Sequence, residues 1–210
     1  MKRTRHISLF GRDEKMKTHD TKSTDTIYGK DIHILPKNEK GVPLFLPLVC
    51  EEIIKQANTK GIFRICGDHM IVQELGKAAL SPNFWVPKCS VHDLASFLKQ
   101  WLRALPKPII NPDLINQLYG DGNENNILDI LGVLDPLDRK CIAIIFATVQ
   151  IVVDQAAINQ MTFSNIEICF KPSFMQNGCG ILSKFNFKLF FDVCIRHMNP
   201  DGDDIQFFID

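Results

Sequence analysis

The sequence predicts an all-α fold, with a single helical domain of about seven to nine helices at residues 41–210 behind a flexible polar arm at residues 1–40. From residue 46 onward, apolar residues recur three and four positions apart, which is the helical period. Asp, Asn or Ser stands before several of these runs as a potential cap, and no series of alternating strands is seen. With 210 residues, 45% of them hydrophobic, the chain is long enough to bury one sizeable core.

The predicted arm, residues 1–40, is rich in Lys, Arg, Thr and Asp and has few apolar positions. It buries too little apolar surface to offset the entropy of ordering, so we expect it to be flexible. Its basic residues could contact an anionic membrane surface. Acidic residues are mixed among them, however, and we favour a solvated tail.

Three helices are expected in the first half of the domain, at Leu46–Ala57, after Asp68, and from Ser90 to Leu105. Pro43 could open the first of these helices, and Lys60-Gly61 ends it. Asp68 can cap the second helix, because its carboxylate can accept a hydrogen bond from an unpaired backbone N–H. Ser90 and Asp93 have the spacing of a capping box at the start of the third helix.

Two further helices are signalled by Asn111-Pro112 and Asp135-Pro136, each a cap followed by proline at the first helical position. The first should be short and close at Gly120, and the second should run long, over about residues 137–157. Thr162 or Ser164 can cap a helix that passes Phe170 and ends before Pro172. A last helix is expected at residues 185–198.

The bulk properties exclude several functions. The 24 basic residues cancel the 24 acidic ones, so no overall field draws the chain to nucleic acid. Seven cysteines lie in apolar runs without a CxxC pair, which indicates reduced, buried thiols and neither zinc nor a disulfide framework. No run approaches the roughly 20 apolar residues of a membrane span, and no signal peptide is seen. We expect a cytoplasmic monomer without a metal.

The segment GIFRICG, residues 61–67, sets Arg64 in a loop between two helices. Gly61 and Gly67 would let this loop turn and come close to a partner's backbone. The apolar residues Ile62, Phe63 and Ile65 can anchor the loop, pack into the core, or do both. Taken alone, an arginine in a loop is more often a surface charge or a helix-terminus partner than a functional group.

Lys99 and Arg103 lie four residues apart on the third helix, on the face opposite Phe97, Leu98 and Trp101. Like charges at this spacing repel mildly. A solvated basic face is one interpretation. The other is a docking site for an acidic or phosphate-bearing surface.

Four blocks, in this order, resemble the GTPase-activating domain for Rho-type GTPases, the RhoGAP family, from Gly41 to about Phe174. They are GVPL at 41–44, GIFRICG at 61–67, HDLASFLKQWLRALPKPI at 92–109 and NQMTFSNIEICFKPSF at 159–174. The resemblance implies that the domain activates a GTP-bound Rho/Rac/Cdc42-type small GTPase, and that the partner supplies GTP and magnesium, so that the chain needs no cofactor of its own.

By the same resemblance, Arg64 takes the place of the family's arginine finger. Lys99 and Arg103 match its KxxLRxLP block, and Asn165 matches the asparagine that helps to hold the finger and the partner's switch region. Asn159 matches the asparagine of the family's NxMT, although a turn or cap is its expected role, ahead of contact with the partner.

The chain departs from the family at Glu167 and at Lys171-Pro172-Ser173. These changes touch the end of the helix that bears Asn165 and leave Arg64 untouched, so we expect weakened or altered docking before loss of the finger. They keep a second function open, a module that binds a GTPase or another signalling protein without accelerating hydrolysis. An autonomous hydrolase is poorly supported, because GxSxG, HExxH and GxxxxGK[ST] are all missing from the sequence.

Overall fold

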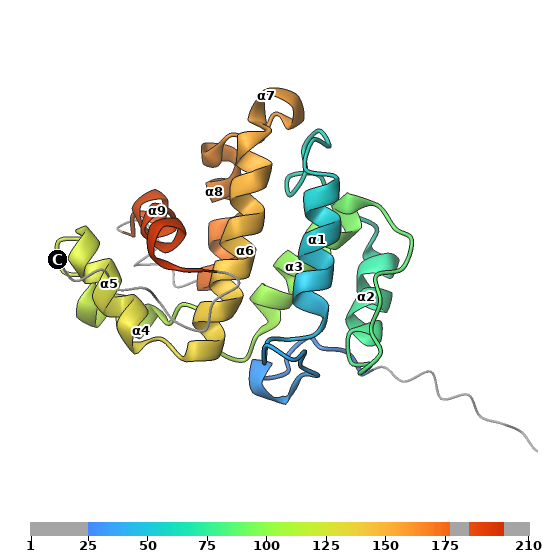
Figure 1. The fold of residues 1–210 in the computed structure, drawn as a ribbon, viewed down its shortest axis with the longest axis horizontal. Coiled ribbons are helices and arrows are strands. Elements are labelled where there is room, and N and C mark those ends of the chain that lie inside the picture. Colours follow the sequence, from blue (N-terminus) through green and yellow to red (C-terminus); the bar gives the residue numbers. More distant parts are fainter. Residues whose placement is uncertain (1–24, 177–184, 200–210) are drawn as a thin grey trace, which may run out of the picture.

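The computed structural model describes residues 25–176 and 185–199, and over these ranges it is all-helical, which confirms the predicted fold class (Figure 1). A short 3-10 helix, η1, is followed by α-helices α1 to α9. Their bounds are η1 Ile32–Ile34, α1 Phe45–Lys55, α2 His69–Ala78, α3 Val91–Ala104, α4 Pro112–Leu118, α5 Glu124–Val133, α6 Pro136–Asp154, α7 Ala156–Asn159, α8 Phe163–Met175 and α9 Phe187–His197.

The long helix α6 lies at the centre of the domain, with α1 along one side and α9 along the other (Figure 1). Helix α1 also packs on α3, and α3 packs on α2 and α8. Trp101 of α3 is fully buried, and its ring meets Phe45 of α1 edge to face at 5.0 Å between centroids. Aromatic pairs of this geometry add to the stabilisation that burial provides.

Four of the predicted caps are confirmed, whereas Thr162 stands at the N-cap of α8 without a side-chain cap hydrogen bond. Asp68 accepts hydrogen bonds from the backbone N–H groups of Met70 and Ile71, and Ser90 with Asp93 forms a capping box. Asn111 and Asp135 each cap a helix that has proline in its first turn. Such caps satisfy backbone donors that the helix itself leaves unpaired.

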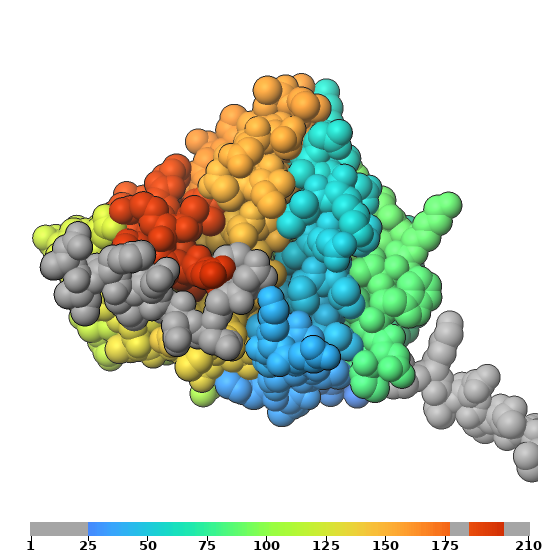
Figure 2. All heavy atoms as spheres, in the orientation of Figure 1, coloured from blue at the N-terminus to red at the C-terminus, as the bar shows by residue number. Residues whose placement is uncertain are grey.

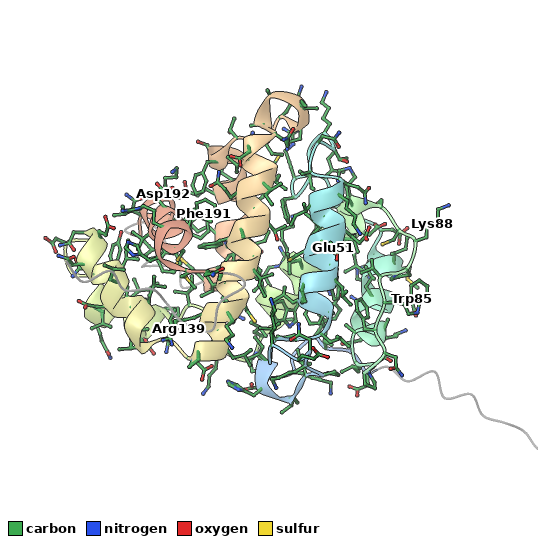
Figure 3. All side chains as sticks on the ribbon, in the orientation of Figure 1. Glu51, Trp85, Lys88, Arg139, Phe191 and Asp192 are labelled. Atoms are coloured by element: carbon green, nitrogen blue, oxygen red, sulfur yellow. The ribbon has the colours of Figure 1, made fainter. Side chains whose placement is uncertain are left out.

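Helix α5 was not predicted, because its first turn, Glu124-Asn125-Asn126, is polar. Asn123 and Asn126 start it through a capping box. Its C-terminal end is held by Arg139, whose Nη1 donates to the carbonyl oxygens of Leu131, Gly132 and Leu134 at 2.9–3.3 Å (Figure 3). A cation at a helix C-terminus also interacts favourably with the helix dipole.

The predicted end of α8 before Pro172 is wrong, since the helix continues to Met175. A proline inside a helix costs roughly 3 kcal/mol. Phe174 and Met175, which follow it, are both fully buried, and burying a side chain of this size contributes about 2 kcal/mol. Burial of these two residues therefore compensates for the lost backbone hydrogen bond.

The flexible arm was expected to extend to residue 40, but the chain already packs on the domain from residue 27. Ile27, Ile32 and Leu35 are buried in the core, and Ile27 N–H donates to the Gly76 carbonyl at 2.9 Å. The hydroxyl of Tyr28 donates to the Val72 carbonyl at 2.7 Å. Figure 2 shows this segment in blue at the lower end of α1. Its apolar residues follow no regular period, so the sequence pattern did not reveal them. Residues 1–24 lie outside the described part of the chain.

The six cysteines in the described residues are all free thiols. Cys50, Cys141 and Cys194 are buried, as expected, but Cys89 and Cys169 are half-buried and Cys66 is exposed. Within the described ranges no helix is long and apolar enough to cross a membrane, and no cluster of three potential metal ligands occurs.

Candidate functional site

The loop between α1 and α2 forms a tight turn beside α7 (Figure 1). The N–H groups of Arg64 and Ile65 both donate to the Gly61 carbonyl, at 2.9 and 2.8 Å, and Gly61 N–H donates to the Asn159 carbonyl at 2.8 Å. Gly61 and Phe63 have φ angles of +72° and +66°. This left-handed conformation suits glycine and costs about 1 kcal/mol or more at phenylalanine. The surrounding packing therefore has to hold the turn in shape.

Two apolar side chains fasten the loop to the domain. Ile62 and Phe63 are fully buried, and the Phe63 ring meets Phe170 of α8 edge to face at 4.9 Å. Ile65, the third expected anchor, is 45% exposed, so this part of the expectation is wrong. The loop is anchored on the side that precedes Arg64.

Arg64 follows the buried Phe63 and is exposed. Its backbone N–H is paired within the turn, and over residues 25–176 and 185–199 its guanidinium has no hydrogen bond or ion pair. The five N–H donors of this side chain are therefore available to another molecule.

We expected Lys99 to project from α3 beside Arg103. This expectation is wrong, because the Lys99 side chain is buried and the residue is only 8% exposed. Its ammonium donates a hydrogen bond to the Phe63 carbonyl oxygen. Burial lowers the pKa of Lys99, and the nearby Arg103 acts in the same direction. Arg103 itself is exposed. Of the predicted pair, Lys99 supports the loop and Arg103 alone remains at the surface.

The second glycine of the loop, Gly67, lies against the start of α3. Its N–H donates to Ser96 Oγ at 2.9 Å, and a Cβ at this position would lie only 2.5 Å from Asp93 Cα. Asp93 Oδ1 also accepts from Asp68 N–H at 2.7 Å. Burial would raise the pKa of Asp93, but hydrogen bonds from Ser90 and Asp68 together hold it below its usual value.

Asp93 was recognised in the sequence only as a helix cap. Its contact with the loop joins residues 25 positions apart, and no local spacing signals it. One carboxylate therefore caps α3 and fixes the end of the loop that carries Arg64.

Asn159 is a buried connector, in agreement with its expected role in a turn. Its Nδ2 donates to the carbonyls of Ala57 and Val152, and its Oδ1 accepts from Met161 N–H, each at 2.7 Å. The residue is fully buried and so does not offer its side chain to a partner. It joins the end of α1 to the end of α6.

Asn165 lies near the start of α8 and is half-buried. Its Nδ2 donates to the Gln160 carbonyl at 3.0 Å. Among the contacts described for these two residues, none joins Asn165 to Arg64. Lys99 and Asn159 therefore contact the loop that carries Gly61 and Arg64. Arg103 and Asn165 make no described hydrogen bond with this loop.

Two of the residues that depart from the family pattern, Glu167 and Lys171, pair with each other. Lys171 Nζ lies 3.4 Å from Glu167 Oε1, one helical turn away, and donates to the Phe185 carbonyl at 2.8 Å. This lysine connects α8 to the segment that precedes α9. Both changes therefore have an internal structural role.

The fold and this loop define an all-helical domain that presents one arginine on a turn supported by α3, α7 and α8. The chain belongs to the RhoGAP domain family, whose sequence profile matches residues 43–178. It is 28% identical over 167 residues to Rho GTPase-activating protein conundrum of Drosophila melanogaster, and the matched region covers 72% of this chain and 26% of that protein. It is 30% identical over 162 residues to GTPase activating protein homolog 3 of Dictyostelium discoideum, and the matched region covers 73% of this chain and 12% of that protein.

A similar fold occurs in the crystal structure of human Rho GTPase activating protein 15. The TM-score is 0.68 at 21% identity, over 81% of this chain and 88% of that chain. The BH domain of GRAF gives a TM-score of 0.59 at 19% identity, over 70% of this chain and 88% of that chain. Against the two curated relatives above, by contrast, the chain spans about a quarter of the length or less.

Proposed function

We propose that this domain accelerates GTP hydrolysis by a Rho-type small GTPase, and that it does so by placing Arg64 in the partner's active site. The observation that carries the proposal is the exposed guanidinium of Arg64, which is unpaired within the described residues and stands on an anchored turn. Membership of the RhoGAP family and the names of its relatives support the same function.

The chemistry of phosphoryl transfer explains the need for an arginine. As the γ-phosphoryl group leaves, negative charge develops on its oxygens and on the bridging oxygen. A guanidinium offers forked donors that can bind two of these oxygens in a site from which water is excluded. The partner would hold GTP, magnesium and the attacking water, and this domain would supply Arg64.

The supporting residues have separate roles in the proposal. Lys99 and Asn159 hold the backbone on either side of Phe63, so the finger is ordered before the partner arrives. Arg103 and Asn165 remain at or near the surface and contact the partner. Lys99 and Asn159 are thus positioning residues.

Single-turnover GTP hydrolysis by a panel of Rho-type GTPases tests the proposal. Loss of an arginine finger costs roughly 10³- to 10⁵-fold in rate, so Arg64→Ala should bring the reaction close to the GTPase's intrinsic rate. Arg64→Lys should recover little, because an ammonium lacks the planar fork. Lys60→Ala removes an exposed cation from the same loop and serves as the matched control.

Two results would contradict the proposal. If Arg64→Ala accelerates hydrolysis as well as the native chain, the finger assignment fails. If the native chain binds GTP-loaded GTPases without accelerating any of them, the domain is a binding module of the same fold.

A further inference from the structure

The loop between α2 and α3, residues 81–90, holds a tryptophan in solvent. Trp85 is 69% exposed, whereas Phe84 directly before it is buried. The Phe84 ring meets Phe45 of α1 edge to face at 6.4 Å between centroids, and Phe84 N–H donates to the Ser81 carbonyl at 3.2 Å. An anchored turn therefore presents a large apolar ring at the surface.

A hollow of about 160 Å³ lies beside this ring. It is lined by uncharged residues only, namely Ala78, Ser81, Asn83, Phe84, Trp85 and Pro87. Single exposed apolar residues are common on proteins, but here the ring continues into an uncharged recess. An indole has an apolar body and one polar N–H, and side chains of this type gather where a membrane meets water.

The loop carries a cation and has no acidic residue of its own. Lys88 is exposed, and residues 81–90 contain no carboxylate. Figure 3 shows Trp85 and Lys88 along the same edge of the domain. An ammonium next to an interfacial tryptophan suits a surface that bears negative charge.

The nearest carboxylates leave the surroundings of the loop close to neutral. Asp93 and Glu52 both lie near it, but Asp93 is only 3% exposed. Glu52 pairs with Lys55 at 2.7 Å, and the same lysine pairs with Glu51 at 2.9 Å. This trio carries one net negative charge, which offsets the positive charge of Lys88. A stronger attraction to an anionic surface has to come from another part of the chain.

The N-terminal segment supplies that charge. Residues 1–24 contain seven basic and three acidic residues, a net charge of +4 in a chain that is neutral as a whole. The segment joins the domain close to the Trp85 loop. Ile27 N–H donates to the Gly76 carbonyl at 2.9 Å, and Gly76 lies two residues before Ala78, which lines the hollow. The apolar ring and the basic segment therefore meet at the C-terminal end of α2.

We propose that the Trp85 loop and the basic segment at residues 1–24 together bind the surface of an anionic phospholipid membrane, with the Trp85 ring inserted among the headgroups. A single weak anchor gives only marginal attachment, and stable attachment takes two signals. Here one signal is apolar and the other is electrostatic. From the sequence alone we favoured a solvated arm, because the sequence does not show that Trp85 lies where the arm joins the domain.

Membrane contact at this loop leaves the Arg64 turn accessible. Arg64 precedes α2 and Trp85 follows it, and the ten residues of α2 span about 15 Å. The two surfaces thus lie at opposite ends of one helix, and the membrane proposal does not depend on the proposed function.

Sedimentation of the full chain with vesicles tests the proposal. Vesicles of phosphatidylcholine are compared with vesicles that also contain phosphatidylserine, at low and high salt. The chain has two tryptophans, and Trp101 is fully buried. Lipids brominated in their acyl chains therefore report on Trp85, because they quench its fluorescence only when the ring enters the membrane.

The chain should bind the phosphatidylserine vesicles far better than the neutral ones, and this binding should weaken as salt rises. Trp85→Ala should weaken it roughly tenfold or more, and Trp85→Phe should weaken it less. Arg3→Gln combined with Arg5→Gln should weaken binding and reduce its salt dependence. Val133→Ala removes an apolar side chain that is 60% exposed on α5, and this matched control should bind like the native chain. The urea midpoint of each variant checks that it is folded.

Three results would overturn the proposal. One is failure of the native chain to bind either kind of vesicle. Another is equal binding by Trp85→Ala and the native chain, or binding without quenching by brominated lipid, since the basic segment would then act alone. The third is self-association that Trp85→Ala abolishes while vesicles bind neither protein, which would assign the loop to contact with a second copy of the chain.

Discussion

The ammonium of Lys99 donates a hydrogen bond to the carbonyl oxygen of Phe63, the residue that directly precedes the exposed Arg64. A buried cation on α3 thus fixes the backbone from which Arg64 projects. Since Phe63 itself has a left-handed conformation, this bond helps to hold a turn that phenylalanine would otherwise avoid. The conformation of the loop at residues 61–67 therefore depends on the Lys99 side chain.

Replacing Lys99 with methionine should therefore loosen the loop. The Phe63 carbonyl would lose its partner, which costs about 1–3 kcal/mol for a buried group, and the rate of stimulated GTP hydrolysis should fall roughly tenfold or more. Hydrogen exchange at the amides of residues 61–67 should become faster. Lys107→Met, which removes an exposed cation just beyond the same helix, should change neither quantity. Unchanged exchange in Lys99→Met would show that the bond is dispensable.

The two asparagines should separate stability from activity. Asn159→Ala removes three buried hydrogen bonds and leaves the Ala57 carbonyl and the Met161 N–H unpaired, whereas the Val152 carbonyl still accepts from Gln155 N–H. The free energy of unfolding in urea should therefore drop by about 2–4 kcal/mol. Asn165→Ala removes one bond at a half-buried site and should cost less than about 1 kcal/mol. Its effect should appear in stimulated hydrolysis instead. The opposite pattern would reverse the roles given to these residues.

Gly67 should not tolerate a side chain. A Cβ would meet the Cα, N and Oδ1 atoms of Asp93 at 2.5–2.7 Å, and two of these are backbone atoms that cannot swing away. We expect Gly67→Ala to destabilise the fold by about 1–3 kcal/mol, as overpacking usually does. Gly132→Ala is the matched control, because a Cβ added there would meet no atom within 4 Å apart from its chain neighbours and the backbone of its own helix. That change, within α5, should stabilise by about 0.5–1 kcal/mol. Equal unfolding midpoints for the two variants would contradict this account.

The sequence predicted the parts of the site that depend on short-range contacts. The cap at Asp68 and the capping box of Ser90 join groups within three residues, so spacing alone revealed them. The loop position of Arg64 followed from the glycines on either side of it. The burial of Lys99 could not be predicted in this way, because its acceptor lies 36 residues away.

The same reason explains the other features that the sequence did not reveal. Asn159 reaches Ala57 across 102 residues, and only the fold brings the two together. Ile27, Ile32 and Leu35 are buried without helical or strand periodicity, which is the signal that a search for amphipathic patterns requires. At Pro172, tertiary burial of Phe174 overrode a local rule about helix ends. Contacts distant in sequence decide all three.

A pocket of about 270 Å³ at the N-terminal end of α6 gives a last prediction, because three of its residues, Asp31, Asp135 and Asp138, are acidic. Burial raises the pKa of Asp138 from 3.8 to about 6, with Asp135 and Asp31 adding to the rise and His33 opposing it. A carboxyl whose pKa is raised on folding stabilises the fold fully below its unfolded pKa, and this contribution is lost as pH rises through the folded value. Asn resembles the protonated form, so Asp138→Asn should raise the urea midpoint at about pH 8 and change it little at about pH 4. Asp129→Asn, on the exposed face of α5, should show no such difference between the two pH values.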